Sequence, residues 1–425
     1  MAAVLGFGPP VLRTALASAL LLASIAAAQP ATYFVPITQR TPSGAGGSPV
    51  PAIALPDPGV GADQSILFST AQGVARPYTL GSLTGTPLSG VPSPQAAVAA
   101  APGVLVKGQS RTLVAVVSGA AVQVGTIESG TFINRGPSVA LLGSAPIGLS
   151  AAADGGAVLL VSDSTGTSLT RWEIDASADT AVAFQRGTAS VSVLGDVAQA
   201  IVVNEVGGFA YVGSTLGNLI AIPPALDAGS TVFDLAQTSQ GRLAAPITGL
   251  DLYGGTAAAS YLLVTSPQGM TLYDLTVSNP RPGAIRVVAQ DVLGQISAPS
   301  GVAVTNLPAG AQQPQGAIAL GDPAQHGVAL LSWATLATQV DGGGLFIDTS
   351  FDPRGPGGGG PDGGRDGGPD GGPDGGGGPT CCGVPPGPGI PVQQPSSCAS
   401  VPGTPLAALA LAALLLGMPR RRQGR

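Results

Sequence analysis

The chain has 425 residues, of which 9% are charged, and its formal net charge is -6. Lys107 is the only lysine and the arginines are scattered outside the extreme C-terminus, so the basic surface that nucleic-acid binding needs is absent and nucleic acid is excluded as a partner. Gly (65) and Pro (40) are abundant, but their excess falls in one tract and the remainder is typical of one large globular domain.

Residues 1–28 have the pattern of a secretory signal peptide. Arg13 precedes an apolar run, and the small residues Ala26 and Ala28 form an A-x-A cleavage site. The run is shorter than the ~18 residues that a membrane span needs, which favours a signal peptide over the alternative of an N-terminal anchor. The three cysteines all lie near the C-terminus, as suits an exported domain that does not depend on disulfides. We therefore expect an exported protein.

The region 32–351 contains many short apolar runs separated by Gly, Asn and Pro turns, and we find no helical periodicity in it. Such runs predict antiparallel strands, and two pairs of them, 158–161 with 169–174 and 209–212 with 219–222, predict hairpins within one sheet. The clearest predicted strands are 65–69, 113–118, 157–162, 201–203, 209–212, 261–265, 301–305 and 317–320.

The number of these strands favours an all-β propeller over a single sandwich. Radially repeated sheets protect strand edges, which would otherwise pair with other chains. The sequence has no strict internal period, so pattern alone does not fix the number of blades.

Residues 352–397 form a tract rich in Gly, Pro and Asp, which predicts a disordered linker because it has almost no apolar surface to bury. Its Asp-Gly-Gly repeats are similar to calcium-binding nonapeptides. Those repeats need an apolar residue in each unit to build a β-roll, and none is present here.

The segment 398–425 combines Cys398, a short apolar helix over 406–418 and the basic cluster Arg420, Arg421 and Arg422. The basic cluster would stay on the cytoplasmic side of a membrane. This arrangement behind a low-complexity linker resembles the C-terminal sorting tags of myxobacterial surface proteins. The resemblance implies contact with the membrane, recognition by a sorting protease, and processing or lipid attachment at Cys398. A simple single-span anchor is the alternative, and it too places the domain at the cell surface or outer envelope.

Between Gln199 and Trp333, strand and turn residues recur in a defined order. The segments in that order are Gln199-Ala200, Asn204-Glu205, Ala210-Tyr211-Val212, Ile247 to Tyr253, Pro267-Gln268-Gly269, Leu272-Tyr273-Asp274, Pro314-Gln315-Gly316, Asp322 and Trp333. The order and spacing resemble the second half of the β-propeller phytases, calcium-dependent enzymes that release phosphate from inositol hexakisphosphate. Residues 147–174 and 50–80 resemble earlier blades of the same family. The resemblance implies a six-bladed propeller, a 3-phytase-like phosphoric monoester hydrolase activity and a Ca²⁺ cofactor.

The departures from the family pattern fall on its chemistry. Phosphomonoester hydrolysis needs hard cations held by several carboxylates and basic groups that clamp phosphate. The residues at the matched positions are not anionic: Gln199, Ser214, Thr215, Leu216, Thr248, Ala298 and Ser300. Glycines, tyrosines and the tryptophan, which shape and pack a propeller, are kept. The sequence therefore predicts the fold more firmly than the activity, and catalytic residues are not assigned.

Four carboxylates lie nearest to the family's functional positions and are candidate calcium ligands: Glu205, Asp251, Asp274 and Asp322. The alternative is that they stabilise turns at strand ends, where Asp accepts backbone N–H bonds. The lone His326 lies in a polar loop without a nucleophile or further ligands, which predicts a surface residue. Trp172 and Trp333 could stack a sugar, but packing between blades is their commoner role.

Three functions remain open from the sequence. The first is an exported, surface-tethered phytase-family propeller with lost or reduced activity. The second is a surface binding or adhesion propeller without a hydrolase role. The third is an active phosphatase with a rebuilt calcium site.

Overall fold

The computed structural model of the chain describes residues between Ala31 and Ile347, all within the first of two compact units, Met1–Arg365 and Asp366–Arg425. Within that span the following residues are not described: 42–49, 55–65, 72–73, 80–88, 92–94, 129–130, 137, 141–145, 164, 192–196, 206, 228–231, 237–242, 255–260, 276–284, 293, 310, 341–344 and 346.

The predicted signal peptide (1–28), linker (352–397) and C-terminal segment (398–425) lie outside the described residues, as do Ala26, Ala28, Cys398 and the three terminal arginines. In the part of the chain that is described, no helix combines the length and the apolar character that crossing a bilayer requires.

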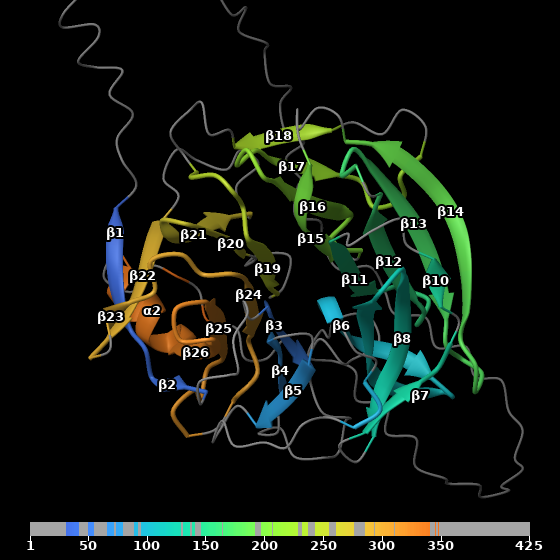
Figure 1. The fold of residues 1–425 in the computed structure, drawn as a ribbon, viewed down its shortest axis with the longest axis horizontal. Helices are drawn as coiled ribbons and strands as arrows, with labels where there is room; N and C mark the ends of the chain where they lie inside the picture. The colour runs from blue at the N-terminus through green and yellow to red at the C-terminus, as the bar shows by residue number, and fades with distance from the viewer. Residues whose placement is uncertain are drawn as a thin grey trace, which may run out of the picture. The chain divides into compact units, whose positions relative to one another are not determined.

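Short strands form six small sheets in the described residues, each named here by its innermost strand (Figure 1). The β3 sheet contains β3 (Val50–Ala54), β4 (Ile66–Ala71) and β5 (Val74–Thr79), and the β6 sheet contains β6 (Gln95–Val106), β7 (Gln109–Ser118), β8 (Ala121–Glu128), β9 (Thr131–Asn134) and β10 (Val139–Ala140). The β11 sheet contains β11 (Ile147–Ala151), β12 (Ala157–Ser162), β13 (Ser168–Asp175) and β14 (Val182–Ser190).

The other three sheets follow in the chain. The β15 sheet contains β15 (Ala198–Asn204), β16 (Phe209–Ser214), β17 (Leu219–Ile222) and β18 (Phe233–Ala236). The β19 sheet contains β19 (Gly249–Tyr253), β20 (Tyr261–Ser266), β21 (Gly269–Asp274), β22 (Ile285–Asp291), β23 (Gly294–Gln295) and β1 (Thr32–Pro36). The β24 sheet contains β24 (Val302–Thr305), β25 (Ala317–Asp322), β26 (Gly327–Ser332) and β2 (Gln39–Arg40).

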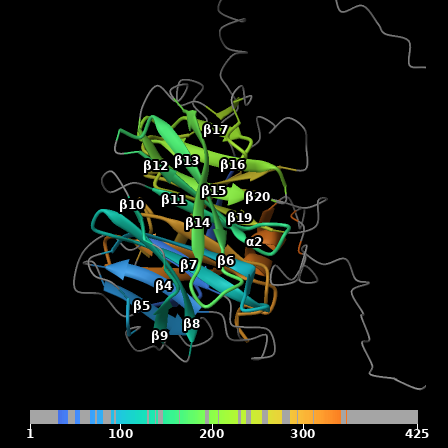
Figure 2. The ribbon, with the colours of Figure 1, turned by 90° about the vertical axis from the view of Figure 1, so that its right-hand side faces the viewer.

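The innermost strands make a closed circuit. Each lies against the innermost strands of two neighbouring sheets, in the order β3, β6, β11, β15, β19, β24 and back to β3. Figure 1 shows these strands around the middle of the ring, and Figure 2 shows the β3 and β6 sheets side by side. The predicted propeller is confirmed, as are the predicted hairpins β12–β13 and β16–β17.

The predicted number of six blades needs correction. In the described residues, five sheets have four or more strands and count as full blades, whereas the β3 sheet has three strands. The arrangement is therefore five full blades with a smaller three-stranded sheet between the β24 and β6 sheets.

Apolar layers between neighbouring sheets make up the core. Val158 and Leu160 of β12 pack with Ile201 and Val203 of β15, and the corresponding layer between the β15 and β19 sheets contains buried Tyr211. Such burial contributes about 25 cal/mol per Å² of apolar surface. Successive side chains of a strand point to opposite faces of its sheet, and these faces supply the layers. The short apolar runs of the sequence therefore predict the strands.

Two glycines permit close approach of neighbouring inner strands. A Cβ atom on Gly249 would lie 2.7 Å from the Cα of Gly301, and one on Gly148 would lie 2.7 Å from a methyl of Ile201. The backbone N of Ile247, just before β19, donates to the carbonyl of Ser214, which pairs with the first residue of β15, and Gly249 lies against Gly301, just before β24. The inner strands β15, β19 and β24 therefore start at the same end and run in the same direction.

The N-terminal residues 31–41, which we call the closing segment, join the two ends of the ring. Strand β1 pairs in parallel with β22, and β2 pairs antiparallel with β26, so the first strands of the chain complete its last two sheets. Val35 is fully buried among residues of both sheets. Arg40 forms ion pairs with Asp291 at the end of β22 (Nε–Oδ2, 2.6 Å) and with Asp322 at the end of β25.

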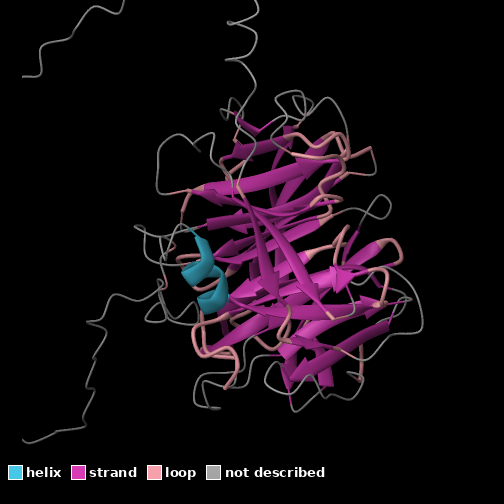
Figure 3. Cartoon of the chain, turned by 90° about the vertical axis from the view of Figure 1, so that its left-hand side faces the viewer, coloured by secondary structure: helices cyan, strands magenta, loops and turns pink. Residues whose placement is uncertain are grey.

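One helix, α2 (Trp333–Gln339), was missed by the sequence analysis, which treated this stretch as part of a blade. Ser332 caps it, because its Oγ accepts a hydrogen bond from the backbone N of Thr335 (3.4 Å). Trp333, Leu336 and Ala337 are buried, which is the spacing of one helical face. The helix is short and is the only one in the described residues (Figure 3).

Replacing Arg40 tests whether its ion pairs hold the ring closed. Because Asp322 is only 5% exposed, Arg40→Ala leaves a buried carboxylate without its cation, and we expect the free energy of unfolding to fall by about 2–4 kcal/mol. The surface residue Arg286 on β22, whose Nε donates to the carbonyl of Gln268 (2.7 Å), is the matched control, and Arg286→Ala should cost less than about 1 kcal/mol. Urea denaturation of both variants measures the difference; equal losses would contradict the role given to Arg40.

Candidate functional site

Glu205, the first candidate ligand, follows β15 and is held by an arginine of the neighbouring sheet. Arg171 of β13 donates from Nη1 to Oε2 of Glu205 (3.1 Å) and from Nη2 to Oε1 (3.0 Å), which is a two-pronged ion pair. The side chain of Arg171 is 10% exposed, so both charges are largely removed from water. The pair links the β11 and β15 sheets.

Arg171 is the centre of a larger network. Its Nη1 also donates to the carbonyl oxygen of Pro224 (2.9 Å), and its Nη2 donates to Oε1 of Glu173 (3.2 Å). Arg186 on β14 donates to the other oxygen of Glu173 (2.6 Å). Burial opposes the ionisation of Glu173, but the hydrogen bonds from Arg186 and Arg171 outweigh it and hold the pKa of this carboxyl below its usual value. The negative charges of Glu173 and Glu205 are therefore balanced by arginines of the protein itself.

Asp322, at the end of β25, is buried, and both of its carboxylate oxygens have partners. Its Oδ1 accepts hydrogen bonds from the backbone N of Ala324 (3.1 Å) and of Gln325 (3.3 Å), and its Oδ2 contacts Arg40. The first pair of bonds is the turn-stabilising role that the sequence analysis named as the alternative to metal binding. Asp322 thus shapes the hairpin between β25 and β26 and anchors the closing segment.

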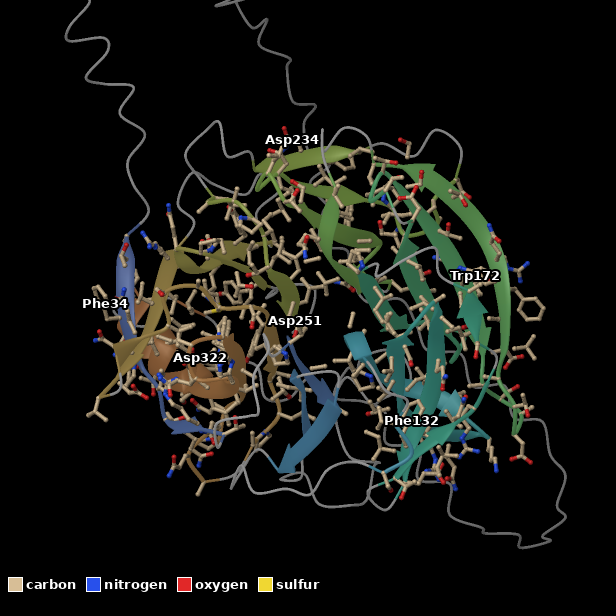
Figure 4. All side chains as sticks on the ribbon, in the orientation of Figure 1. Phe34, Phe132, Trp172, Asp234, Asp251 and Asp322 are labelled. Atoms are coloured by element: carbon tan, nitrogen blue, oxygen red, sulfur yellow. The ribbon has the colours of Figure 1, made fainter. Side chains whose placement is uncertain are left out.

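Asp251 lies in β19, at the inner ring, where Figure 4 shows it near the middle of the fold. Its Oδ1 accepts from the backbone N of Leu252 (2.8 Å), and its Oδ2 accepts from the backbone N of Val304 on β24 (2.6 Å). It therefore joins the inner strands of two neighbouring sheets. Burial raises the pKa of the Asp251 carboxyl to about 7, although the two backbone hydrogen bonds favour the charged form.

Asp274, the fourth candidate, is exposed at the end of β21. The four carboxylates do not gather. Inner strands run in one direction around the ring and their partners run the opposite way, so Glu205, after an inner strand, and Asp322, ending a second strand, lie at opposite ends of their sheets. Among the described residues, no three His, Cys, Asp or Glu side chains come together as metal ligands. The calcium site remains a prediction.

The remaining candidates from the sequence are two tryptophans and His326. Trp333 is fully buried and stacks on Tyr253, with ring centroids 3.8 Å apart and planes within 6°. Trp172 is partly buried against the layer between the β6 and β11 sheets. His326 is exposed in the turn between β25 and β26, as predicted, with a left-handed φ of 50°. None of the three presents a free aromatic or imidazole face in a defined pocket.

The sequence analysis missed the arginines that occupy the carboxylates. A signal was available, because Arg171 in strand β13 is followed two residues later by the oppositely charged Glu173. In a strand, residues two apart share a face, so this spacing predicts a pair on one side of the sheet. The partners Glu205 and Asp291 could not be found this way, since they lie on other sheets.

A pair of exposed aromatic rings lies at one end of the β15 sheet. Phe209 and Phe233 begin β16 and β18, are 37% and 47% exposed, and meet edge to face with centroids 6.0 Å apart. The nearly buried Tyr211 lies behind Phe209 at 6.4 Å. Large aromatic rings left in water in this way are typical of contact surfaces.

A scan against protein-family models and a search of curated proteins both found no match to this chain. The fold assigns the chain to the class of β-propeller proteins.

Replacing Asp251 should change how stability depends on pH. The folded pKa of about 7 exceeds the unfolded value of 3.8, so the folded state favours the proton, and the free energy of unfolding falls as pH rises from about 4 to 7 and then levels off. We expect this carboxyl to account for a fall of about 2–4 kcal/mol, which Asp251→Asn removes.

Urea denaturation at pH 4.5 and pH 8 measures the effect. Asp227→Asn, which changes an exposed carboxylate near the β15 sheet, is the control and should leave the pH profile of the wild type unchanged. An Asp251→Asn variant with the wild-type profile would contradict the assigned titration.

Proposed function

We propose that this protein is an exported β-propeller, held at the cell surface, that binds an external partner and has lost the phosphohydrolase chemistry of the phytase family it resembles. The signal-peptide pattern of residues 1–28 and the Cys, apolar and Arg pattern of residues 398–425 support export and surface tethering. In this proposal the tail contacts the membrane and a sorting protease, and Cys398 is its processing or lipid-attachment site.

The candidate carboxylates Glu205 and Asp322 already form ion pairs with arginines, and this observation carries the proposal. Calcium takes six to eight oxygen ligands and needs carboxylates that are free to turn toward it. Glu205 is already bound by Arg171, and Asp322 is bound by Arg40 and by two backbone N–H groups. Moving either acid to a metal would break an ion pair of a largely buried arginine and leave it with one carboxylate partner, Asp291 for Arg40 and Glu173 for Arg171, which is costly.

The ancestry part of the proposal rests on the order of segments from Gln199 to Trp333. These segments lie in strands and turns of the β15, β19 and β24 sheets, except for Trp333, which begins helix α2. An active phosphatase with a rebuilt calcium site is the alternative. The separation of Glu205 and Asp322 to opposite ends of their sheets speaks against it.

The binding part of the proposal uses the exposed pair Phe209 and Phe233. Contact residues that contribute most to protein binding are enriched in aromatic side chains, which bury a large area at a small cost in conformational entropy. The pair is rigid, because both rings begin strands of the same sheet and contact each other. A partner that covers these rings would gain apolar contact without a large rearrangement of the propeller.

A phosphate-release assay tests the loss of chemistry. With inositol hexakisphosphate and calcium, the purified full chain is expected to release no more phosphate than a heat-inactivated sample. Calcium-dependent release that Asp274→Ala abolishes would instead establish an active phosphatase, since Asp274 is the candidate ligand that is exposed.

A cell-binding assay tests the contact surface. The labelled full chain should be retained on intact cells of the producing organism, and the double variant Phe209→Ser/Phe233→Ser should bind about tenfold more weakly, as expected when a central aromatic contact is lost. Phe184→Ser on β14 is the matched control, because Phe184 is 46% exposed but belongs to another sheet. Equal retention of the two variants would contradict the assignment of this surface.

A further inference from the structure

The closing segment is bound by the propeller much as a separate peptide would be. Its backbone follows the outer edges of β22 and β26: the N of Ile37 donates to the carbonyl of Gln290 (2.9 Å), and the N of Thr38 donates to that of Leu330 (2.8 Å). Pairing at a free sheet edge is a general way in which proteins bind extended chains. We call these two edges the docking edge.

Side chains give the docking edge its selectivity. Val35 enters the apolar layer, and Arg40 reaches carboxylates on both sheets. The hydroxyl of Thr41 accepts from the backbone N of Val328 (2.8 Å), and that of Thr38 donates to the carbonyl of Leu330 (3.0 Å). An extended segment with a buried valine and an arginine five residues later meets these requirements.

The backbone pairing, hydrogen bonds and ion pairs of the closing segment are made with residues between Arg286 and Leu330, far away in the sequence. They include the amide of Gln313, which donates to the hydroxyl of Thr38 (2.8 Å). The connection to the rest of the chain is residues 42–49, which consist of Pro, Ser, Gly and Ala. The docking contacts therefore do not depend on which copy of the chain supplies the segment.

We propose that the docking edge also accepts the closing segment of a second copy of this chain, so that two propellers exchange residues 31–41 and form a dimer. Each exchanged segment makes the same contacts as before, and each propeller remains closed, so the exchange costs mainly association entropy. Reciprocal exchange satisfies both docking edges and gives a closed pair instead of an open chain. This inference is independent of the proposed surface binding and of phosphatase activity.

Shortening the connection tests the exchange. Thr41 bonds to Val328 of β26, Val328 pairs with Gly321 of β25, and Gly321 bonds to Gly301, against which Val50 packs, so three strand spacings, about 14 Å, separate Thr41 from this contact. After deletion of residues 43–48, Thr41 and Val50 could be at most about 11 Å apart. The deletion removes no described contact but prevents a segment from reaching its own docking edge. We expect this variant to have the wild-type circular dichroism spectrum and twice the monomer mass by light scattering. A folded monomer would overturn the proposal.

Mixing two full-length chains keeps the proposal testable even if the deletion variant does not fold. Unlabelled and ¹⁵N-labelled wild-type proteins, incubated together at high concentration just below the unfolding temperature, should give dimers of intermediate mass by native mass spectrometry. An Arg40→Ala chain mixed with the wild type under the same conditions should give at least fivefold fewer mixed dimers, because its segment lacks the cation that Asp291 and Asp322 bind. Monomers alone in the wild-type mixture, or mixed dimers unaffected by Arg40→Ala, would overturn strand exchange.

Discussion

Closure of the ring by its own N-terminal residues is the constraint on which the rest of the structure depends. A ring of sheets leaves an edge wherever the chain begins and ends, and an open edge both exposes unpaired backbone groups and lets the blades separate. Here β1 and β2 cover the edges of β22 and β26, and Arg40 ties the two sheets through Asp291 and Asp322. The first and last parts of the domain therefore stabilise each other.

Ion pairing also explains where the few charged residues of the domain lie. In a chain with 9% charged residues, several acids with little exposure form ion pairs with arginines, whereas Asp251 accepts hydrogen bonds from backbone N–H groups. Arg171 with Glu205 joins the β11 and β15 sheets, and Arg135 contacts Glu128 and donates to the hydroxyl of Thr126 (3.1 Å) within the β6 sheet. A carboxylate in such a pair is held in one position by its arginine. This suits a residue that stabilises the fold and does not suit a metal ligand.

The sequence predicted the parts of the fold that arise from local pattern. Strands such as β12 and β16 are short apolar runs bounded by turn residues, and their hairpins follow from neighbouring runs. The closing segment was not predicted, because its partners lie about 250 or more residues away. Helix α2 was missed since seven residues are too few to show a helical period. The placement of Glu205 and Asp251 likewise depends on neighbouring sheets, which the strand pattern leaves undetermined.

The proposed ancestry and the proposed loss of activity concern different kinds of residue. The residues that keep blades together, such as Gly249 against Gly301 and Trp333 on Tyr253, act through steric fit and stay useful whatever the propeller binds. A calcium and phosphate site needs several acids at one place, and losing one of them removes most of the selection on the others. In the proposed function, Glu205 and Asp322 serve as ion-pair partners of Arg171 and Arg40. Moving such an acid to a metal ion would weaken the contacts between sheets, so in the proposed function the ion pairs oppose calcium binding at these positions.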